Sequence, residues 1–275
     1  MTTAGIRPKS PTERLLAANS WLVYAFFYAP ILVLIVFSFN ANRNVGVWTG
    51  LSTRWYAEMF RNDDVMRALR NSLIVAAGST VVSTVLGTAA AVSIERFRYR
   101  GQRVFDGLLY VPIIIPDVTM AVMMLLFFVQ AFDIVNGLAG TAFNLGLGTI
   151  TLSHIAFNIS FVAVVVRARL GQLDNSLEEA ASDLYANRWQ AFRYVTLPLI
   201  MPGVLGGALL ALTLSLDDVV VTSFVAGPGS TTLPVYVFGL VRRGVSPLIN
   251  AVSTLMLVAS MVLVGVSLGF QRRPE

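Results

Sequence analysis

The chain of 275 residues lacks cysteine, and it contains one histidine, His154, and one lysine, Lys9. Without cysteine it can form no disulfide, no thiolate metal site and no cysteine nucleophile. A single histidine also excludes a metal site built from several histidines. Lys9 does not belong to a G-x-x-x-x-G-K-[ST] sequence, so the chain has no P-loop with which to hydrolyse ATP. We therefore nominate no catalytic residue, no metal site and no cofactor bound by this chain.

Charge is also scarce, because 13% of the residues are charged while 56% are hydrophobic. Ordinary soluble domains do not have this balance. Apolar blocks of about 20 residues, the length that crosses a bilayer as a helix, recur along the chain. The sequence predicts an all-α membrane protein with a tail (1–20), a membrane domain (21–270) and a second tail (271–275). The net charge of +5 is spread over loops, so lipid is an expected partner and nucleic acid is not.

Six transmembrane helices are predicted, and proline residues mark several of their boundaries. The third span contains Pro112 and Pro116, which are expected to break it. An external loop, 41–70, is expected to hold a short amphipathic helix, and a second external loop, 226–246, a short apolar helix at 234–241. The six spans are predicted at residues 21–39, 71–94, 104–132, 149–166, 198–225 and 247–270.

The distribution of basic residues predicts the orientation. Six spans place both termini on one side of the membrane. The two tails and the loops on their side carry 13 Lys and Arg residues, and the opposite loops carry 7. Basic residues are enriched in cytoplasmic loops. The termini and the polar loop at 171–197 are therefore predicted to lie in the cytoplasm.

The loop at 171–197 is predicted to form two short helices joined by a turn. Ser176 and Glu179 have the spacing of a capping box, in which each side chain bonds the other residue's backbone N–H. Asn187 and Gln190 repeat that spacing, so a second helix is expected to begin there. Such a loop presents a small, structured surface to another protein.

Within this loop, Glu179-Ala180-Ala181 is followed, fourteen residues after the second alanine, by Val195-x-Leu197-Pro198. This pattern resembles the EAA loop of ABC importer permeases, which lies in the cytoplasm and docks into a groove on the ATPase subunit. The family has glycine where this chain has Tyr185, and Asn187, which tolerates a left-handed conformation, is expected to form the turn instead. The resemblance implies an ATPase-coupling loop made by Glu178, Glu179, Ala180, Ala181, Asp183, Leu184, Tyr185, Leu197 and Pro198.

Three further segments, 48–56, 215–229 and 244–251, resemble permeases of spermidine/putrescine importers. The resemblance implies the type I importer permease fold in the bacterial cytoplasmic (inner) membrane. It also implies a heterodimer with a second permease, two ATPase subunits that bind ATP and Mg²⁺, and an external binding protein. Polyamines are the implied substrate; the alternatives within this class are cationic amino-acid derivatives, opines, iron and thiamine.

Acidic residues within predicted spans are costly in lipid and usually functional. Asp217 and Asp218 follow Pro198 by 19 and 20 residues, so they are expected about 28–30 Å along the helix. Asp117 is expected about 20 Å from the cytoplasmic side. All three are nominated for the path of a cationic substrate. They could instead pair with an arginine such as Arg242 or cap a break in a helix.

Two other classes of protein were weighed against a permease. An ion-coupled secondary transporter would need inverted repeats and a buried ionisable relay, and no convincing repeat is visible. His154 and Asn158 lie on one helix face, where His154 is expected to be a hydrogen-bonding strut between helices. An intramembrane enzyme would need a nucleophile and a base, and the G-x-S-x-G match at 265–269 lies inside an apolar helix, where that motif cannot form its strand-to-helix turn. The sequence therefore favours a transport subunit that is not an enzyme.

Overall fold

The computed structural model describes residues 11–174, 176–244 and 246–271. Within these ranges the chain is almost entirely helical, apart from turns, loops and one isolated bridge between Asn40 and Leu51. The elements are α1 (Pro11–Ser38), α2 (Arg54–Arg61), α3 (Asp63–Arg96), α4 (Gln102–Ile114), α5 (Asp117–Ala139), α6 (Leu147–Leu170), α7 (Ser176–Asp183), α8 (Arg188–Ala191), the π-helical turn η1 (Phe192–Thr196), α9 (Leu197–Asp217), α10 (Val220–Val225), α11 (Leu233–Arg243) and α12 (Pro247–Gln271).

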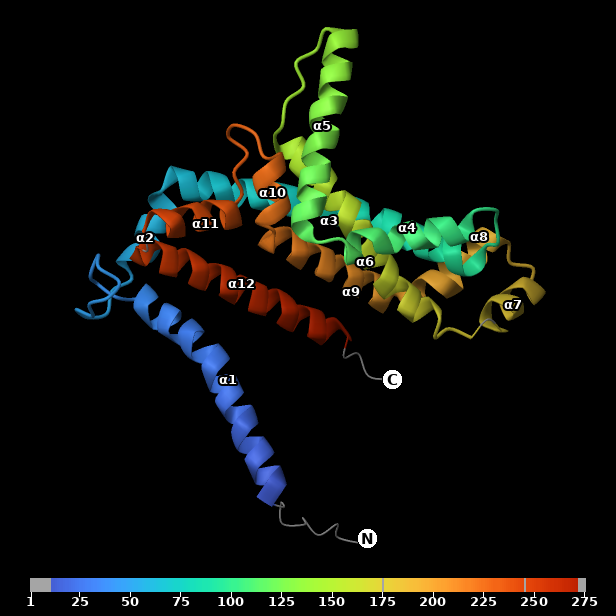
Figure 1. Cartoon of the computed structure of the whole chain (residues 1–275). Coiled ribbons are helices and arrows are strands. Elements are labelled where there is room, and N and C mark those ends of the chain that lie inside the picture. The colour runs from blue at the N-terminus through green and yellow to red at the C-terminus, as the bar shows by residue number, and fades with distance from the viewer. Residues whose placement is uncertain (1–10, 175, 245, 272–275) are drawn as a thin grey trace.

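Helices α3, α6 and α9 pack against one another and form the core of the protein (Figure 1). Their contact is close because glycines face Val162, a fully buried residue of α6. A Cβ atom placed on Gly87 of α3 would lie 2.7 Å from the Cβ atom of Val162, and one on Gly207 of α9 would lie 3.3 Å from its Cα atom. Small residues therefore let these membrane helices approach closely.

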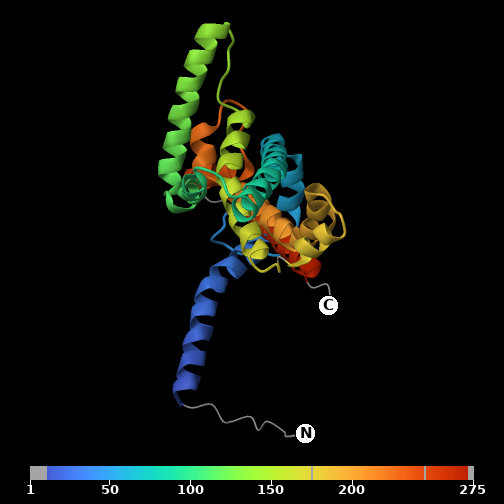
Figure 2. The ribbon, with the colours of Figure 1, turned by 90° about the vertical axis from the view of Figure 1, so that its right-hand side faces the viewer.

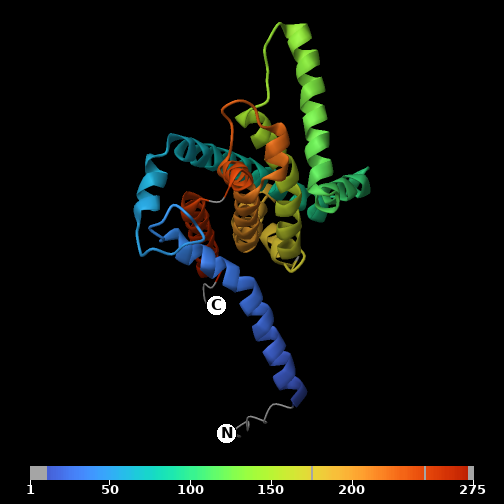
Figure 3. The same ribbon diagram turned by 60° about the vertical axis from the view of Figure 1, so that its left-hand side comes forward.

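Two apolar helices, α1 and α5, extend away from the core in opposite directions (Figures 2 and 3). Large apolar side chains cover both, and most of them are exposed. Helix α1 packs against α12. Helix α5 packs against α10, and Met120, Ala121 and Phe128 are its buried residues. Faces of this size and hydrophobicity have to be covered by lipid or by another protein.

Five helices within the described ranges are long and apolar enough to cross a membrane. They are α1, α3, α5, α6 and a continuous helix from Arg188 to Asp217. Helix α12 begins at Pro247, as predicted, but the apolar stretch assigned to it, Pro247–Val262, is shorter. Residues 1–10 and 272–275 lie outside the described part of the chain. The six-span count and the cytoplasmic position of both tails therefore stay predictions.

The third span differs in part from its prediction. Residues 104–132 were expected to form one span broken by Pro112 and Pro116. Pro112 instead lies inside α4, which ends at Ile114, and a separate helix, α5, begins at Asp117. Pro116 precedes α5, and Ile115 before it adopts the extended conformation, with φ −72° and ψ 134°. A residue before proline is disfavoured in the helical region. The chain therefore changes direction at this point, and α5 alone is long enough to span a membrane.

The external loop at 41–70 also differs from its prediction. It was expected to contain one amphipathic helix, but it contains α2 and the first two turns of α3. Trp55 and Met59 of α2 and Val65 of α3 are buried, so the expected apolar face exists on two helices. Asn62 separates them: its side-chain oxygen accepts the N–H groups of Asp64 and Val65 and caps α3. The short apolar helix expected at 234–241 is confirmed as α11.

Candidate functional site

The loop between α6 and α9 lies at one end of the core, and α2 and α11 lie at the other end (Figure 1). The two predicted loop helices are present as α7 and α8. The capping box of α8 is confirmed, because the Gln190 N–H donates to the Asn187 side chain at 2.9 Å and the Asn187 N–H donates to the Gln190 side chain at 2.8 Å.

The capping box predicted for Ser176 and Glu179 at the start of α7 is wrong. Ser176 is already helical, and its N–H donates to the Asp174 carboxylate at 2.9 Å, which lowers the pKa of Asp174.

Helix α8 continues without a break into the next span. The helix passes through η1 and on to α9, which carries Pro198 in its first turn. Proline has no N–H, so it cannot complete the α-helical hydrogen bond at its own position. The π turn η1 ends at Thr196, two residues before Pro198, and single π turns of this kind occur inside otherwise continuous α-helices. The loop is therefore joined rigidly to α9 at one end.

The turn that closes α7 is left-handed, and Tyr185 forms it with a φ of 65°. The Ala186 N–H donates to the Ala181 carbonyl at 3.0 Å, and the Tyr185 N–H donates to the Ser182 carbonyl at 3.0 Å. These two bonds define a Schellman motif, in which glycine is the usual residue at the left-handed position. The expectation that Asn187 takes over this turn is wrong, because Asn187 is extended with a φ of −74°.

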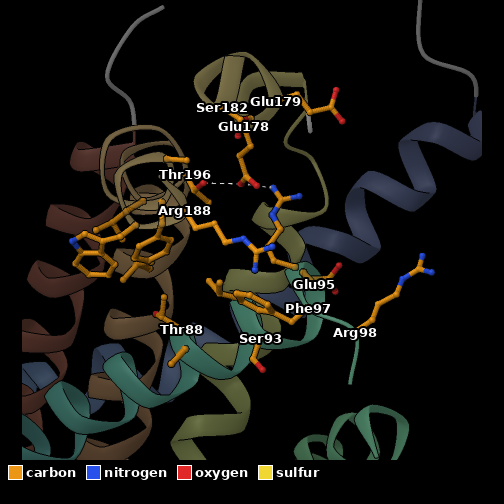
Figure 4. Close-up of a pocket in the computed structure, with 18 of the residues that line it drawn as sticks. Thr88, Ser93, Glu95, Phe97, Arg98, Glu178, Glu179, Ser182, Arg188 and Thr196 are labelled. Atoms are coloured by element: carbon orange, nitrogen blue, oxygen red, sulfur yellow. Dashed lines mark hydrogen bonds and ion pairs between the residues drawn. The ribbon is translucent and has the colours of Figure 1, made fainter. Parts of the chain in front are cut away.

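The carboxylates of Glu178 and Glu179 point in different directions (Figure 4). Glu178 points toward the core, where its Oε1 atom lies 3.1 Å from Nη2 of Arg96 on α3. The same oxygen accepts the hydroxyl of Thr196 in η1 at 2.6 Å. Glu179 is exposed and points away from this pair. The sequence did not nominate Arg96 or Thr196; the arginine cluster that follows α3 was the available signal for Arg96.

A groove of about 1440 Å³ lies between the end of α3 and the loop helices. Apolar side chains and charged side chains of both signs line it. Of the predicted loop residues, Glu178, Glu179, Asp183 and Leu197 line it. Arg96, Arg98 and Arg188 line it as well, so the loop lies beside the basic segment that follows α3, as the predicted orientation requires.

The outer surface of the loop is apolar and exposed. Leu184 is 82% exposed and Tyr185 is 97% exposed, and Trp189 of α8 is also exposed. Ala180 is exposed and Ala181 half-buried, so the face between them is small and smooth. Apolar side chains gathered at an exposed helical turn are typical of a protein-binding surface. Ala180, Leu184 and Tyr185 therefore lie on one exposed surface, whereas Glu178 points toward the core and Leu197 and Pro198 lie farther along the chain in α9.

The second candidate feature is a break in the fifth predicted span. That span was expected to be one helix over 198–225, but α9 ends at Asp217 and α10 begins at Val220. The Asp218 carboxylate accepts the Val221 N–H at 3.3 Å and the Thr222 N–H at 2.7 Å, so it caps α10. This contact matches the second role expected for Asp218, which was to cap a break in a helix and not to line the substrate path.

His154 joins this break to α6. It is completely buried; its Nδ1 atom lies 2.7 Å from the Ser215 hydroxyl, and its Nε2 atom lies 3.1 Å from the Thr222 hydroxyl and 3.3 Å from Asp218. Ser215 also bonds Ser79 of α3 at 3.1 Å. The role of His154 as a hydrogen-bonding strut between helices is therefore confirmed.

The three nominated acidic residues occupy different environments. The Asp218 side chain is 12% exposed, and its carboxylate is engaged by His154, Val221 and Thr222. Asp217 is exposed at the end of α9. Asp117 is exposed in the first turn of α5, where the chain changes direction after Pro116. Asp117 and Asp217 thus have accessible carboxylates, and the Asp218 carboxylate is held beside the break by its hydrogen bonds.

The sequence matches a known family of membrane proteins. Residues 83–273, more than half of the chain, match the family described as binding-protein-dependent transport system inner membrane component. The chain belongs to this family. A relative in it, the putrescine transport system permease protein PotI of Escherichia coli K12, is 47% identical over 239 residues, which cover 86% of this chain and 84% of PotI. The spermidine/putrescine transport system permease protein PotC of the same strain is 41% identical over 242 residues, 88% of each chain.

Solved structures of ABC transporters contain chains with the same fold. A chain of a bacterial transporter involved in the import of alginate has a TM-score of 0.74 at 19% identity, covering 95% of this chain and 99% of that one. A chain of the methionine transporter MetNI has a TM-score of 0.60 at 20% identity, covering 76% and 94%. The fold expected from the EAA-like loop, that of an ABC transporter permease, is confirmed at this level.

Proposed function

We propose that this protein is the permease subunit of an ATP-driven ABC importer and forms half of a translocation pathway for putrescine or spermidine. The observation that carries the proposal is the similarity to two polyamine permeases, PotI and PotC, over more than four-fifths of this chain. The complex would contain a second permease, two ATPase subunits that bind ATP and Mg²⁺, and an external binding protein. It would lie in the bacterial cytoplasmic membrane, with both termini in the cytoplasm.

The loop helices supply the contact with the ATPase in this proposal. The exposed surface of Ala180, Leu184 and Tyr185 would enter a groove on the ATPase, and Glu179 and Asp183 would provide polar contacts at its edge. The continuous helix from the loop into α9 supports this role, because it joins the docking surface to a membrane span. Closure of the ATPase dimer would then reach the core through α9.

The acidic residues supply the substrate path in this proposal. A polyamine is a polycation, and carboxylates near the outer opening lower the cost of removing it from water. Asp117 and Asp217 would contact the substrate, and Asp218 would contribute the field of a fixed charge. We expect Asp217→Asn to raise the substrate concentration for half-maximal uptake. If Asp217→Asn and Asp117→Asn both left uptake and apparent affinity unchanged, this path would be rejected.

Co-purification tests the class of protein. This chain would carry an affinity tag and be co-expressed with the genes beside it on the chromosome. We expect an ATPase subunit and a second permease to co-purify. Leu184→Glu should remove the ATPase and retain the second permease, because it places a charge on the docking surface. The control is Leu51→Glu, an equally exposed leucine in the external loop. A chain that captures no ATPase would contradict the proposal.

A further inference from the structure

Two adjacent residues at the last turn of α3 form ion pairs with different helices. Arg96 pairs with Glu178 of α7, with 3.1 Å between Nη2 and Oε1. Glu95 accepts the Arg167 Nε–H at 2.9 Å, and Arg167 belongs to α6. Arg167 also donates to the Asp106 carboxylate of α4. The end of α3 is therefore linked by charged side chains to α4, α6 and α7.

Glu178 makes a second link from the same oxygen, which accepts the Thr196 hydroxyl at 2.6 Å. The Glu178 side chain thus ties α7 both to α3 and to η1, the π turn directly before α9. The side chains of Arg96 and Glu178 are 18% and 31% exposed. A partly buried pair is screened less by salt than an exposed one. The hydrogen bond from the Thr196 hydroxyl to the Glu178 carboxylate is charge-assisted, and such a bond fixes the geometry more firmly than a neutral one.

Without this tie, α7 would be held chiefly through its chain connections and its packing against α8 and η1. Pressure on its outer surface could then tilt it without moving α3. With the tie, a displacement of α7 pulls on the end of α3. The ion pair of Glu95 with Arg167 transmits this displacement from α3 to α6. The ion pair of Arg167 with Asp106 transmits it on to α4. Glu179, one residue along, points away from this cluster and leaves its carboxylate for a partner (Figure 4).

We infer that Glu178 is a positioning residue for coupling, distinct in role from Glu179. Together with Arg96 and Thr196 it fastens α7 to α3, so that the loop and the ends of α3, α4 and α6 move as one rigid unit when the ATPase subunits close. This inference rests on the proposed function. It assigns Glu178 to the transmission of movement and Glu179 to the contact with the ATPase.

The first test measures substrate taken up per ATP hydrolysed in proteoliposomes that contain the complete complex. Glu178→Gln and Arg96→Gln are expected to lower this ratio at least fivefold while the amount of bound ATPase stays at the wild-type level. Exchanging the charges, with Arg96→Glu and Glu178→Arg together, is expected to restore the ratio to within twofold. A merely structural residue would not give such a rescue. Glu58→Gln and Arg67→Gln, from exposed ion pairs near the external end, are matched controls expected to change nothing.

The second test uses the absence of cysteine from the natural chain. Arg96→Cys and Glu178→Cys would be combined, and the two thiols would be joined by a bis-maleimide with a short spacer. We expect the uncrosslinked double variant to couple poorly and the crosslinked one to recover, because α7 and α3 need to stay together throughout the cycle. Loss of uptake on crosslinking would mean that they must separate, and it would overturn the inference.

The outcomes separate this inference from the proposed function. A wild-type complex that shows no ATP-driven uptake refutes the proposed function. A wild-type complex that transports, with Glu178→Gln and Arg96→Gln giving the same ratio, refutes the tie alone. If the single variants do not accumulate, the charge exchange decides: a normal ratio supports the tie, and a low ratio with normal ATPase binding overturns it.

Discussion

The carboxylate of Asp218 accepts both the backbone N–H and the hydroxyl of Thr222, each at 2.7 Å. This double contact fixes the first turn of α10 directly after α9 ends. His154, from α6, approaches the same two residues and Ser215. The break in the helix is therefore built by a buried polar network that links the ends of α9 and α10 to the core.

Replacing Asp218 should destabilise the protein more than replacing its neighbour. Asp218→Ala removes the cap of α10 and a partner of His154, and the loss of a helix cap typically lowers the free energy of unfolding by about 0.5–2 kcal/mol. Asp217→Ala removes an exposed carboxylate and should lower it by less than about 0.5 kcal/mol. Thermal unfolding of the detergent-solubilised proteins would compare the two variants. Equal midpoints would contradict the capping role of Asp218.

Tyr185→Gly should stabilise the turn after α7. A left-handed residue other than glycine costs roughly 1–2 kcal/mol, part of which the larger backbone entropy of glycine offsets. Hydrogen exchange of the amides of Tyr185 and Ala186, which form the Schellman bonds, is expected to slow several-fold. Asn187→Gly is the matched control: Asn187 has negative φ and caps α8, so its replacement should give no gain. Faster exchange in Tyr185→Gly would contradict the left-handed turn.

Gly87→Ala should disturb the contact between α3 and α6. A Cβ atom at this position would lie 2.8 Å from the Ile159 carbonyl oxygen and 2.7 Å from the Cβ atom of Val162. Overpacking of a tight contact typically costs about 1–3 kcal/mol. Gly107→Ala in α4 is the control, because apart from its chain neighbours and its own helix backbone no heavy atom lies within 4 Å of the new Cβ. An unfolding midpoint of Gly87→Ala equal to that of the control would show that the two helices are not in close contact.

Much of the helical framework could be predicted from the sequence because each span is an apolar block with polar or proline boundaries. Helix α12 begins at Pro247, and α11 lies within two residues of its predicted range. The division at Pro116 was harder to predict, because a proline in an apolar block can either kink one helix or separate two. The break after Asp217 was harder still, because no proline marks it and apolar residues continue on both sides.

The candidate site was predicted in part, and the missing part lies in contacts between distant residues. The coupling loop was found because its residues are contiguous. The pairing of Arg96 with Glu178 was not, because the fold brings together two charges from separate segments. The hydrogen bonds of His154 were expected in kind, but their partners in α9 and α10 depend on the packing of α6. The left-handed Tyr185 contradicts a local rule that favours glycine or asparagine.

ATP-driven uptake of labelled putrescine and spermidine is the measurement that tests the central claim most directly. The complete complex would be reconstituted in proteoliposomes, with the external binding protein present or absent and with a complex carrying Leu184→Glu as the control. We expect uptake of at least one polyamine that requires both ATP and the binding protein, and none in the control. A complex that hydrolyses ATP but takes up neither polyamine would contradict the substrate. Uptake that continues without ATP would contradict an ABC importer altogether.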